Sequence, residues 1–172
     1  SAVDIEDRVV RNELDMAVVA GPRPHGELRA RELAEDRFVL IAPPSAAPGR
    51  RLRQSDLRDA GWVFREEGSD ARRQTLRWLQ RKRLTPSCVV TVDGPPAVIE
   101  AVAAGLGFAL TSARAADAAI GAGRVVSVEA DPALPVRAFW LADHPHKHHG
   151  PACQAMLALI TSFSDRPSRS RK

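Results

Sequence analysis

The stretch AVIEAVAAGLGFALT, residues 97–111, decides the fold. It follows two prolines, its one titratable side chain is Glu100, and it is interrupted by Gly105 and Gly107. Prolines suit the first turn of a helix, because the N–H that they lack has no partner there. A glycine after the last apolar turn suits the left-handed conformation that ends a helix. The stretch therefore predicts a buried helix, a sharp turn at Gly107 and a buried strand over residues 108–111.

Patterns typical of strands and helices alternate along the rest of the chain. Apolar periodicity and capping residues predict helices over residues 4–13, 55–61, 68–83, 112–123 and 151–163. Apolar and β-branched runs predict strands over residues 14–20, 28–44, 62–66, 88–93, 124–130 and 136–142. This alternation predicts an α/β protein with mainly parallel sheets.

Composition narrows the class of protein. The chain has 172 residues, of which 44% are hydrophobic and 27% charged, the balance of an ordinary globular protein. No apolar run approaches the roughly 20 residues that span a bilayer, so we expect no membrane partner. The net charge of +4 invites a nucleic-acid partner, but the basic clusters at residues 50–53, 72–83 and 166–172 lie mostly beside acidic residues and contain a single aromatic residue, Trp78. We therefore interpret these clusters as solvated surface.

Cysteine and histidine give no metal motif. Cys88 and Cys153 form no C-x-x-C pair, and we expect both to be buried, reduced core thiols, which fits a cytoplasmic location. The stretch DHPHKHHG, residues 143–150, holds four of the five histidines. Its spacing matches no standard zinc site, so we expect a solvated loop, no metal and no cofactor. The N-terminal residues also show no secretory signal.

Four stretches, in this order, resemble the effector-binding domain of LysR-type transcriptional regulators. They are RNELDMAVVAG (11–21), LAEDRFVLIAPPSAAP (33–48), DLRDAGWVFREEGSDARR (56–73) and VDGPPAVIEAVAAGLGFALT (92–111). Three details depart from the family pattern: Asn12-Glu13 stands where a glycine is common, the histidine of a Pro-x-x-His-Pro region is absent, and Thr111-Ser112 replaces a Leu-Pro ending. The resemblance extends over about residues 4–163.

The resemblance implies a two-lobed periplasmic-binding-protein-like fold of type 2. Lobe one would comprise residues 1–43 and 130–172 and lobe two residues 44–129, with crossing strands between them. The first part of lobe one and the DNA-binding winged helix-turn-helix would lie outside this chain. The implied function is effector sensing and oligomerisation in a bacterial regulator: a small anionic metabolite binds between the lobes and controls DNA binding and transcription by allostery. The partners would be this effector, further copies of the chain in a dimer or tetramer, and DNA only through the helix-turn-helix.

Two helix starts carry the expected effector site. The helices after Gly68 and after Asp93 would offer free N–H groups and a favourable dipole to an anion. Ser69 would add a hydroxyl and Arg72 a carboxylate clamp, whereas Asp70 and Asp93 leave a zwitterionic or hydroxyl-bearing ligand open as an alternative. With the positions that the family resemblance adds, the expected effector-binding residues are Gly21, Gly68, Ser69, Asp70, Arg72, Asp93, Gly94, Pro95 and Thr111. The alternative is that Ser69 and Asp70 are simple helix caps and Arg72 an exposed charge.

Two other function classes compete with the regulator. An enzyme is not expected, because the chain has no G-x-S-x-G elbow, no Walker loop and no G-x-G-x-x-G after a strand. A solute-binding receptor of a transporter would share the fold, but it would be an exported monomer. The lack of a signal sequence, the two free thiols and the order of the motifs favour the regulator.

Overall fold

The computed structural model describes residues 2–45, 54–129 and 133–164. The chain divides into two compact units, unit 1 with residues 1–35 and 137–172, and unit 2 with residues 36–136. These boundaries lie a few residues away from those of the expected lobes, at residues 43 and 130. The difference arises because the second half of one long strand pairs with strands of unit 2 from Phe38 onward. No helix in the described part of the chain is long and apolar enough to cross a membrane.

Unit 1 is built from both ends of the chain. Its elements are α1 (Ala2–Val10), β1 (Met16–Gly21), the first half of β2 (Arg29–Ala42), β7 (Val136–Asp143) and α6 (Pro151–Ser164). β1 and β7 pair antiparallel, from Met16 opposite Asp143 to Gly21 opposite Ala138. The buried core cluster is small and consists of Val9, Leu28 and Ala142.

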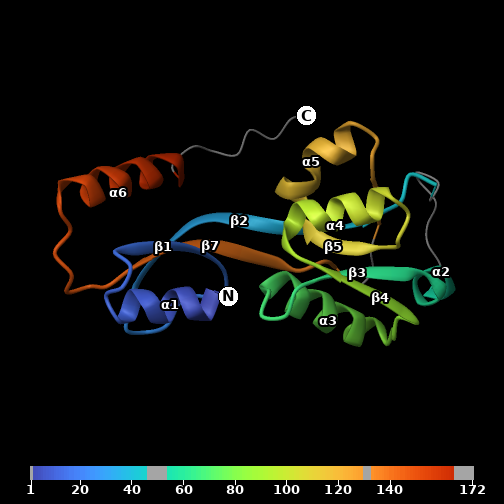
Figure 1. Ribbon diagram of the computed structural model, residues 1–172, viewed down its shortest axis with the longest axis horizontal. Coiled ribbons are helices and arrows are strands. Elements are labelled where there is room, and N and C mark those ends of the chain that lie inside the picture. Colours follow the sequence, from blue (N-terminus) through green and yellow to red (C-terminus); the bar gives the residue numbers. More distant parts are fainter. Residues whose placement is uncertain (1, 46–53, 130–132, 165–172) are drawn as a thin grey trace. The chain divides into compact units, whose positions relative to one another are not determined.

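Unit 2 holds the larger core. Its elements are the second half of β2, α2 (Gln54–Asp59), β3 (Gly61–Arg65), α3 (Asp70–Lys82), β4 (Cys88–Val92), α4 (Gly94–Ala103), β5 (Ala109–Ser112), α5 (Ala113–Gly121) and β6 (Val126–Val128). Helix α3 lies on one side of the strands, and α4 and α5 lie on the other (Figure 1). On the α3 side, Trp62, Trp78 and Phe108 pack together, with ring centroids 6.2 Å apart from Trp62 to each of the other two.

Helices α3 and α6 both form where the sequence predicts them, but they differ in burial. In α3, Ala71, Thr75, Trp78 and Leu79 are all buried. The last helix also forms where it is predicted, but none of residues 151–162 is buried.

The stretch at residues 97–111 forms the predicted helix, turn and strand. Gly105 has a φ of 90° and Gly107 a φ of 139°, both in the region that favours glycine. The N–H of Leu106 donates to the carbonyl of Ala101 at 3.1 Å, which closes the helix end. A Cβ on Gly107 would lie 1.9 Å from the carbonyl oxygen of Gly61, so a side chain there is excluded.

The expected α/β fold is confirmed, but the expectation of mainly parallel sheets is wrong for the pairings seen. β1–β7, β2–β5 and β2–β6 are antiparallel, and β3–β4 is parallel. The reason is that the chain passes from unit 1 into unit 2 along β2 and returns to unit 1 along β7. β2 runs opposite to β5 and β6, and β7 runs opposite to β1. The expectation of two core thiols is also wrong: Cys88 is exposed on β4, which pairs with β3 in a two-stranded sheet, and Cys153 is half-buried.

Candidate functional site

The starts of α3 and α4 lie at one edge of unit 2. β3 and β4 are parallel neighbours, with Arg65 opposite Val92, so the segments that follow them leave the sheet at the same edge. Phe108, directly before β5, forms a parallel bridge with Trp62 of β3. Ligands of α/β proteins bind preferentially outside the carboxyl ends of the strands. The expected positions from Gly68 to Thr111 therefore belong to one edge of one unit.

The first turn of α3 follows an N-cap residue whose hydroxyl makes no cap hydrogen bond. Gly68 has a φ of 80°, and Ser69 caps the helix in an extended conformation without a side-chain cap hydrogen bond. Asp70 is buried and pairs with Arg73 at 3.1 Å. Ser69 therefore stands at the cap position with a hydroxyl that does not bond the first turn, and the negative charge of Asp70 is balanced by a neighbour.

Arg72 is held against the strand ends instead of extending into solvent. Its Nη1 donates to the carbonyl of Arg65 at 3.0 Å and to Oγ1 of Thr91 at 3.2 Å. Its guanidinium carbon lies 5.6 Å from the centroid of the Phe64 ring, a distance at which a cation is attracted to the face of the ring. These contacts from β3 and β4 fix one positive charge at the edge where the two helices begin.

Glu66 is a charged group at this edge that sequence reasoning missed. Its two oxygens accept hydrogen bonds from Arg65 at 2.6 Å each, and Oε2 also accepts the N–H of Gly94 at 3.3 Å. The hydrogen bonds from Arg65 lower the pKa of Glu66 to about 2, against the opposing effect of burial and with help from the Gly94 N–H. The first backbone N–H of α4 therefore already donates a hydrogen bond to a carboxylate of the protein itself. No sequence pattern links Glu66 to a glycine 28 residues later, so this contact could not be predicted.

The start of α4 lies beside a groove with mostly apolar walls. Asp93 caps the helix without a side-chain cap hydrogen bond, and Gly94 has a φ of 79°. Pro95 lines a groove of about 490 Å³ between α4 and α5. That groove is walled mainly by proline rings, Ile99 and the alanines of α5, with an ion pair between Glu100 and Arg124. Because its walls are mostly apolar, the groove does not present the polar groups that an anion requires.

Thr111 and Gly21 complete the expected set. Thr111 is buried in β5 opposite Val39, and the neighbouring Ser112 hydroxyl donates to the fully buried Asp36 at 2.5 Å. Asp36 is a second group that no sequence pattern pointed to. Gly21 lies in unit 1, at the end of β1, where its carbonyl accepts the indole N–H of Trp140 at 3.1 Å.

Comparison with known proteins agrees with this architecture. The family described as the LysR substrate binding domain matches residues 1–164. The HTH-type transcriptional regulator CbbR of Rhodospirillum rubrum is 26% identical over 153 residues, which cover 88% of this chain and 51% of the relative. The chain thus spans about half the length of this curated relative.

Solved structures show the same fold. The CcmR regulatory domain of Synechocystis PCC6803, in complex with 2-PG, has a TM-score of 0.77 and 20% identity, and the match covers 94% of this chain and 79% of that one. The bromide-bound regulatory domain of HypT from Salmonella typhimurium has a TM-score of 0.80 and 14% identity, covering 94% and 78%.

Proposed function

We propose that this chain, which belongs to the family of LysR substrate-binding domains, binds a small anionic effector at the carboxyl edge of β3, β4 and β5 in unit 2. The observation that carries the proposal is the guanidinium of Arg72, held by Arg65 and Thr91 beside the start of α3. A fixed cation next to the first turn of a helix is a favourable place for a carboxylate, phosphate or sulfate group.

We assign the anionic group of the effector to the first turn of α3 and not to that of α4. The carboxylate of Glu66 already accepts the N–H of Gly94, so a second anion at α4 would be repelled. At α3, the Ser69 hydroxyl makes no cap hydrogen bond, and the charge of Asp70 is paired with Arg73. Gly68, Asp93, Pro95 and Thr111 stay proposed contacts for the remainder of the effector.

The solved structures with bound ligands support an anion. The CcmR regulatory domain holds 2-PG and the HypT regulatory domain holds a bromide ion. These proteins share the fold, and we extend the ligand class, without a specific identity, to this chain.

The effector would act through the longer protein to which such domains belong. The curated relatives are named as transcriptional regulators, which favours regulation over solute transport and over an enzyme. We propose that effector binding favours one conformation of the domain and that a cytoplasmic dimer or tetramer passes this preference to DNA-binding domains. DNA contact would be made by the helix-turn-helix and not by this domain.

The proposal is tested by calorimetric titration with sulfate and with 2-PG. Arg72→Ala should weaken binding roughly tenfold or more, because a hydrogen bond to a charged group contributes about 1.5–3 kcal/mol. Ser69→Ala should weaken binding several-fold while leaving thermal stability unchanged, since the hydroxyl makes no cap hydrogen bond.

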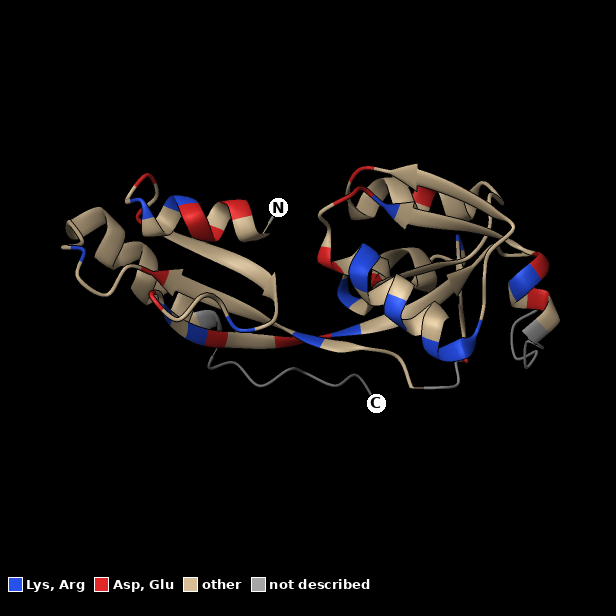
Figure 2. Ribbon diagram, turned by 90° about the horizontal axis from the view of Figure 1, so that it is seen from below, with Lys and Arg blue, Asp and Glu red and all other residues tan. Residues whose placement is uncertain are grey.

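Arg77→Ala is the matched control, because Arg77 is an exposed arginine of the same helix. Basic residues recur along the length of this helix, α3 (Figure 2). It should leave affinity nearly unchanged. Equal losses for Arg72→Ala and Arg77→Ala would show that only the overall positive charge of α3 attracts the anion, and the proposed site would be wrong.

A further inference from the structure

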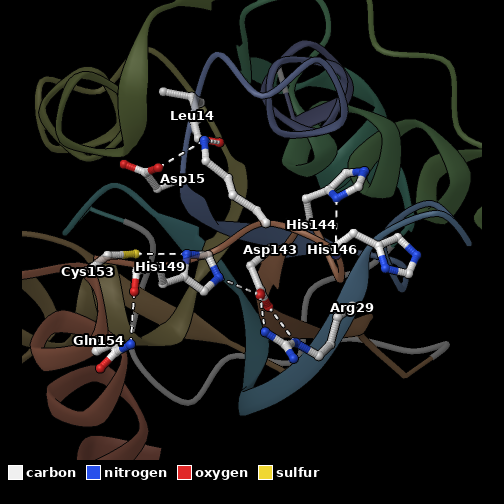
Figure 3. A network of polar contacts seen from close by, with 10 residues as sticks. Leu14, Asp15, Arg29, Asp143, His144, His146, His149, Cys153 and Gln154 are labelled. Carbon is white, nitrogen blue, oxygen red and sulfur yellow. Dashed lines mark hydrogen bonds and ion pairs between the residues drawn. The ribbon is translucent and has the colours of Figure 1, made fainter. Parts of the chain in front are cut away.

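Three side chains of unit 1 form a chain of polar contacts that the proposed effector site does not use. Cys153 Sγ lies 3.1 Å from Nδ1 of His149, and His149 Nε2 lies 2.9 Å from Oδ2 of Asp143 (Figure 3). Asp143 ends β7, His149 lies in the loop that follows, and Cys153 stands in the first turn of α6. Arg29 of β2 binds the same carboxylate through Nε and Nη2. This order of thiol, imidazole and carboxylate is that of a nucleophile, its base and a group that orients the base.

The carboxylate fixes which nitrogen of His149 faces the sulfur. Burial opposes ionisation of Asp143, but hydrogen bonds from Arg29 and His149 outweigh burial and hold the pKa of the carboxyl below its usual value. Asp143 is therefore charged at neutral pH and accepts a hydrogen bond from the N–H at Nε2 of His149. With Nε2 as the donor to Asp143, the lone pair of the ring is on Nδ1, which accepts the S–H of Cys153.

The thiol needs this base in order to react. Burial raises the pKa of Cys153, the negative charges of Asp15 and Asp143 raise it further, and Lys147 opposes them. The sulfur is therefore a protonated thiol at rest, and the thiolate forms when a neighbouring group removes the proton. His149, whose side chain is 8% exposed, stands within hydrogen-bonding distance of the sulfur. Cys153 is itself half-buried, so a small molecule can reach it.

We propose that Cys153 is a site of oxidation by hydroperoxides, with His149 as its general base and Asp143 as a positioning residue. In the step, Sγ attacks the outer peroxide oxygen, an S–O bond forms and the O–O bond breaks. His149 Nδ1 takes the thiol proton and gives it to the departing alkoxide or hydroxide oxygen. The sulfur loses two electrons and becomes a sulfenic acid, and the hydroperoxide is reduced to an alcohol or water. This inference concerns unit 1 and does not depend on the effector site of unit 2.

Oxidation would change how α6 is held. Within residues 151–162 no side chain is buried, and the helix start is linked to the loop by the Cys153–His149 contact and by Gln154, whose Nε2 donates to the carbonyl of His149 at 2.8 Å. A sulfenic oxygen between the sulfur and the imidazole removes the thiol–imidazole hydrogen bond. The start of α6 thereby loses one of these two contacts, which couples the oxidation state of the sulfur to the position of the helix.

The test compares the two cysteines of one protein. The chain is treated with hydrogen peroxide at neutral pH, sulfenic acid is trapped with dimedone, and mass spectrometry follows Cys153 and Cys88 separately. Cys88 is the internal reference because it is exposed on β4. General acid–base catalysis contributes about 10²–10⁴-fold, of which the raised pKa removes part, so Cys153 should be labelled roughly tenfold faster than Cys88. If Cys153 in the unchanged protein is labelled no faster than Cys88, the proposal is overturned.

Two variants separate the base from mere exposure of the thiol. His149→Gln should slow labelling of Cys153 at least tenfold and leave that of Cys88 unchanged. Asp143→Asn keeps a side chain of similar size and should also slow Cys153, with a changed pH profile of the rate. A variant in which Cys153 is labelled as fast as in the unchanged protein, or faster, would show that accessibility and not the imidazole governs the reaction.

Discussion

Glu66→Gln removes one negative charge from the edge of unit 2 and keeps the size of the side chain. In the structure, Glu66 accepts two hydrogen bonds from Arg65 and one from the N–H of Gly94. The carboxylate thus joins the end of β3 to the start of α4. The glutamine oxygen can still accept from one donor, but the amide nitrogen would face the other donors.

The lowered pKa of Glu66 sets the size and the pH dependence of the effect. A carboxyl whose pKa falls from 4.5 to about 2 gains up to about 3 kcal/mol from its folded surroundings. The side chain is 33% exposed, so solvent screening reduces this to about 1–2 kcal/mol. Because the pKa in the folded state is lowered, the contribution is present above pH 4.5 and is lost as the pH falls toward 2.

Urea unfolding, followed by the fluorescence of the buried Trp62 and Trp78, measures this contribution in unit 2. Glu66→Gln should lower the free energy of unfolding by about 1–2 kcal/mol at neutral pH and by clearly less near pH 3. An equal difference in the free energy of unfolding between the two proteins at both pH values would show that the loss does not come from the charge.

Three further substitutions test other contacts. Gly107→Ala should destabilise unit 2 by about 3 kcal/mol or more in urea unfolding, because the residue combines a φ of 139° with a Cβ 1.9 Å from the Gly61 carbonyl oxygen; a loss below about 1 kcal/mol would contradict this. Ser112→Ala should cost about 1–3 kcal/mol by the same assay, since the buried Asp36 loses a donor, and an unchanged midpoint would argue against that contact. Asp143→Asn should lower the thermal midpoint more at pH 7 than near pH 3, because the lowered pKa of Asp143 makes its charge stabilising above its usual pKa; a pH-independent loss would show that only shape matters.

The parts of the fold that local patterns encode could be predicted from the sequence. The helix, turn and strand of residues 97–111 follow from two prolines, an apolar stripe and two glycines, and all three form as predicted. Strand direction could not be predicted in the same way. β1 pairs with β7 more than 100 residues later, and apolar periodicity carries no information about which distant strand will lie alongside or in which direction.

The candidate site was predictable where backbone order decides it. Because strand and helix alternate, the starts of α3 and α4 each follow the end of a strand. The parallel pairing of β3 with β4 then brings Gly68–Asp70 and Asp93–Pro95 to one edge. Glu66 was missed because its role depends on a contact with Gly94 that only the folded chain creates.

The histidine-rich loop was misinterpreted for the same reason. Its composition is typical of a solvated segment, and His146 and His148 are exposed as expected. His149, however, is buried against Asp143 at the end of β7, because the loop turns back toward that strand before α6 begins. One residue of a polar run can thus belong to the interior when a buried carboxylate is available to it.

Whether unit 2 binds an anion at the start of α3 is best measured by amide NMR spectra recorded during titration with sulfate and then with 2-PG. We expect the largest saturable shifts at the amides of Ser69, Asp70, Ala71 and Arg72, with a smaller shift at Gly94. Shifts that do not saturate, or that centre on the α4–α5 groove around Ile99, would show that no anion binds at the start of α3.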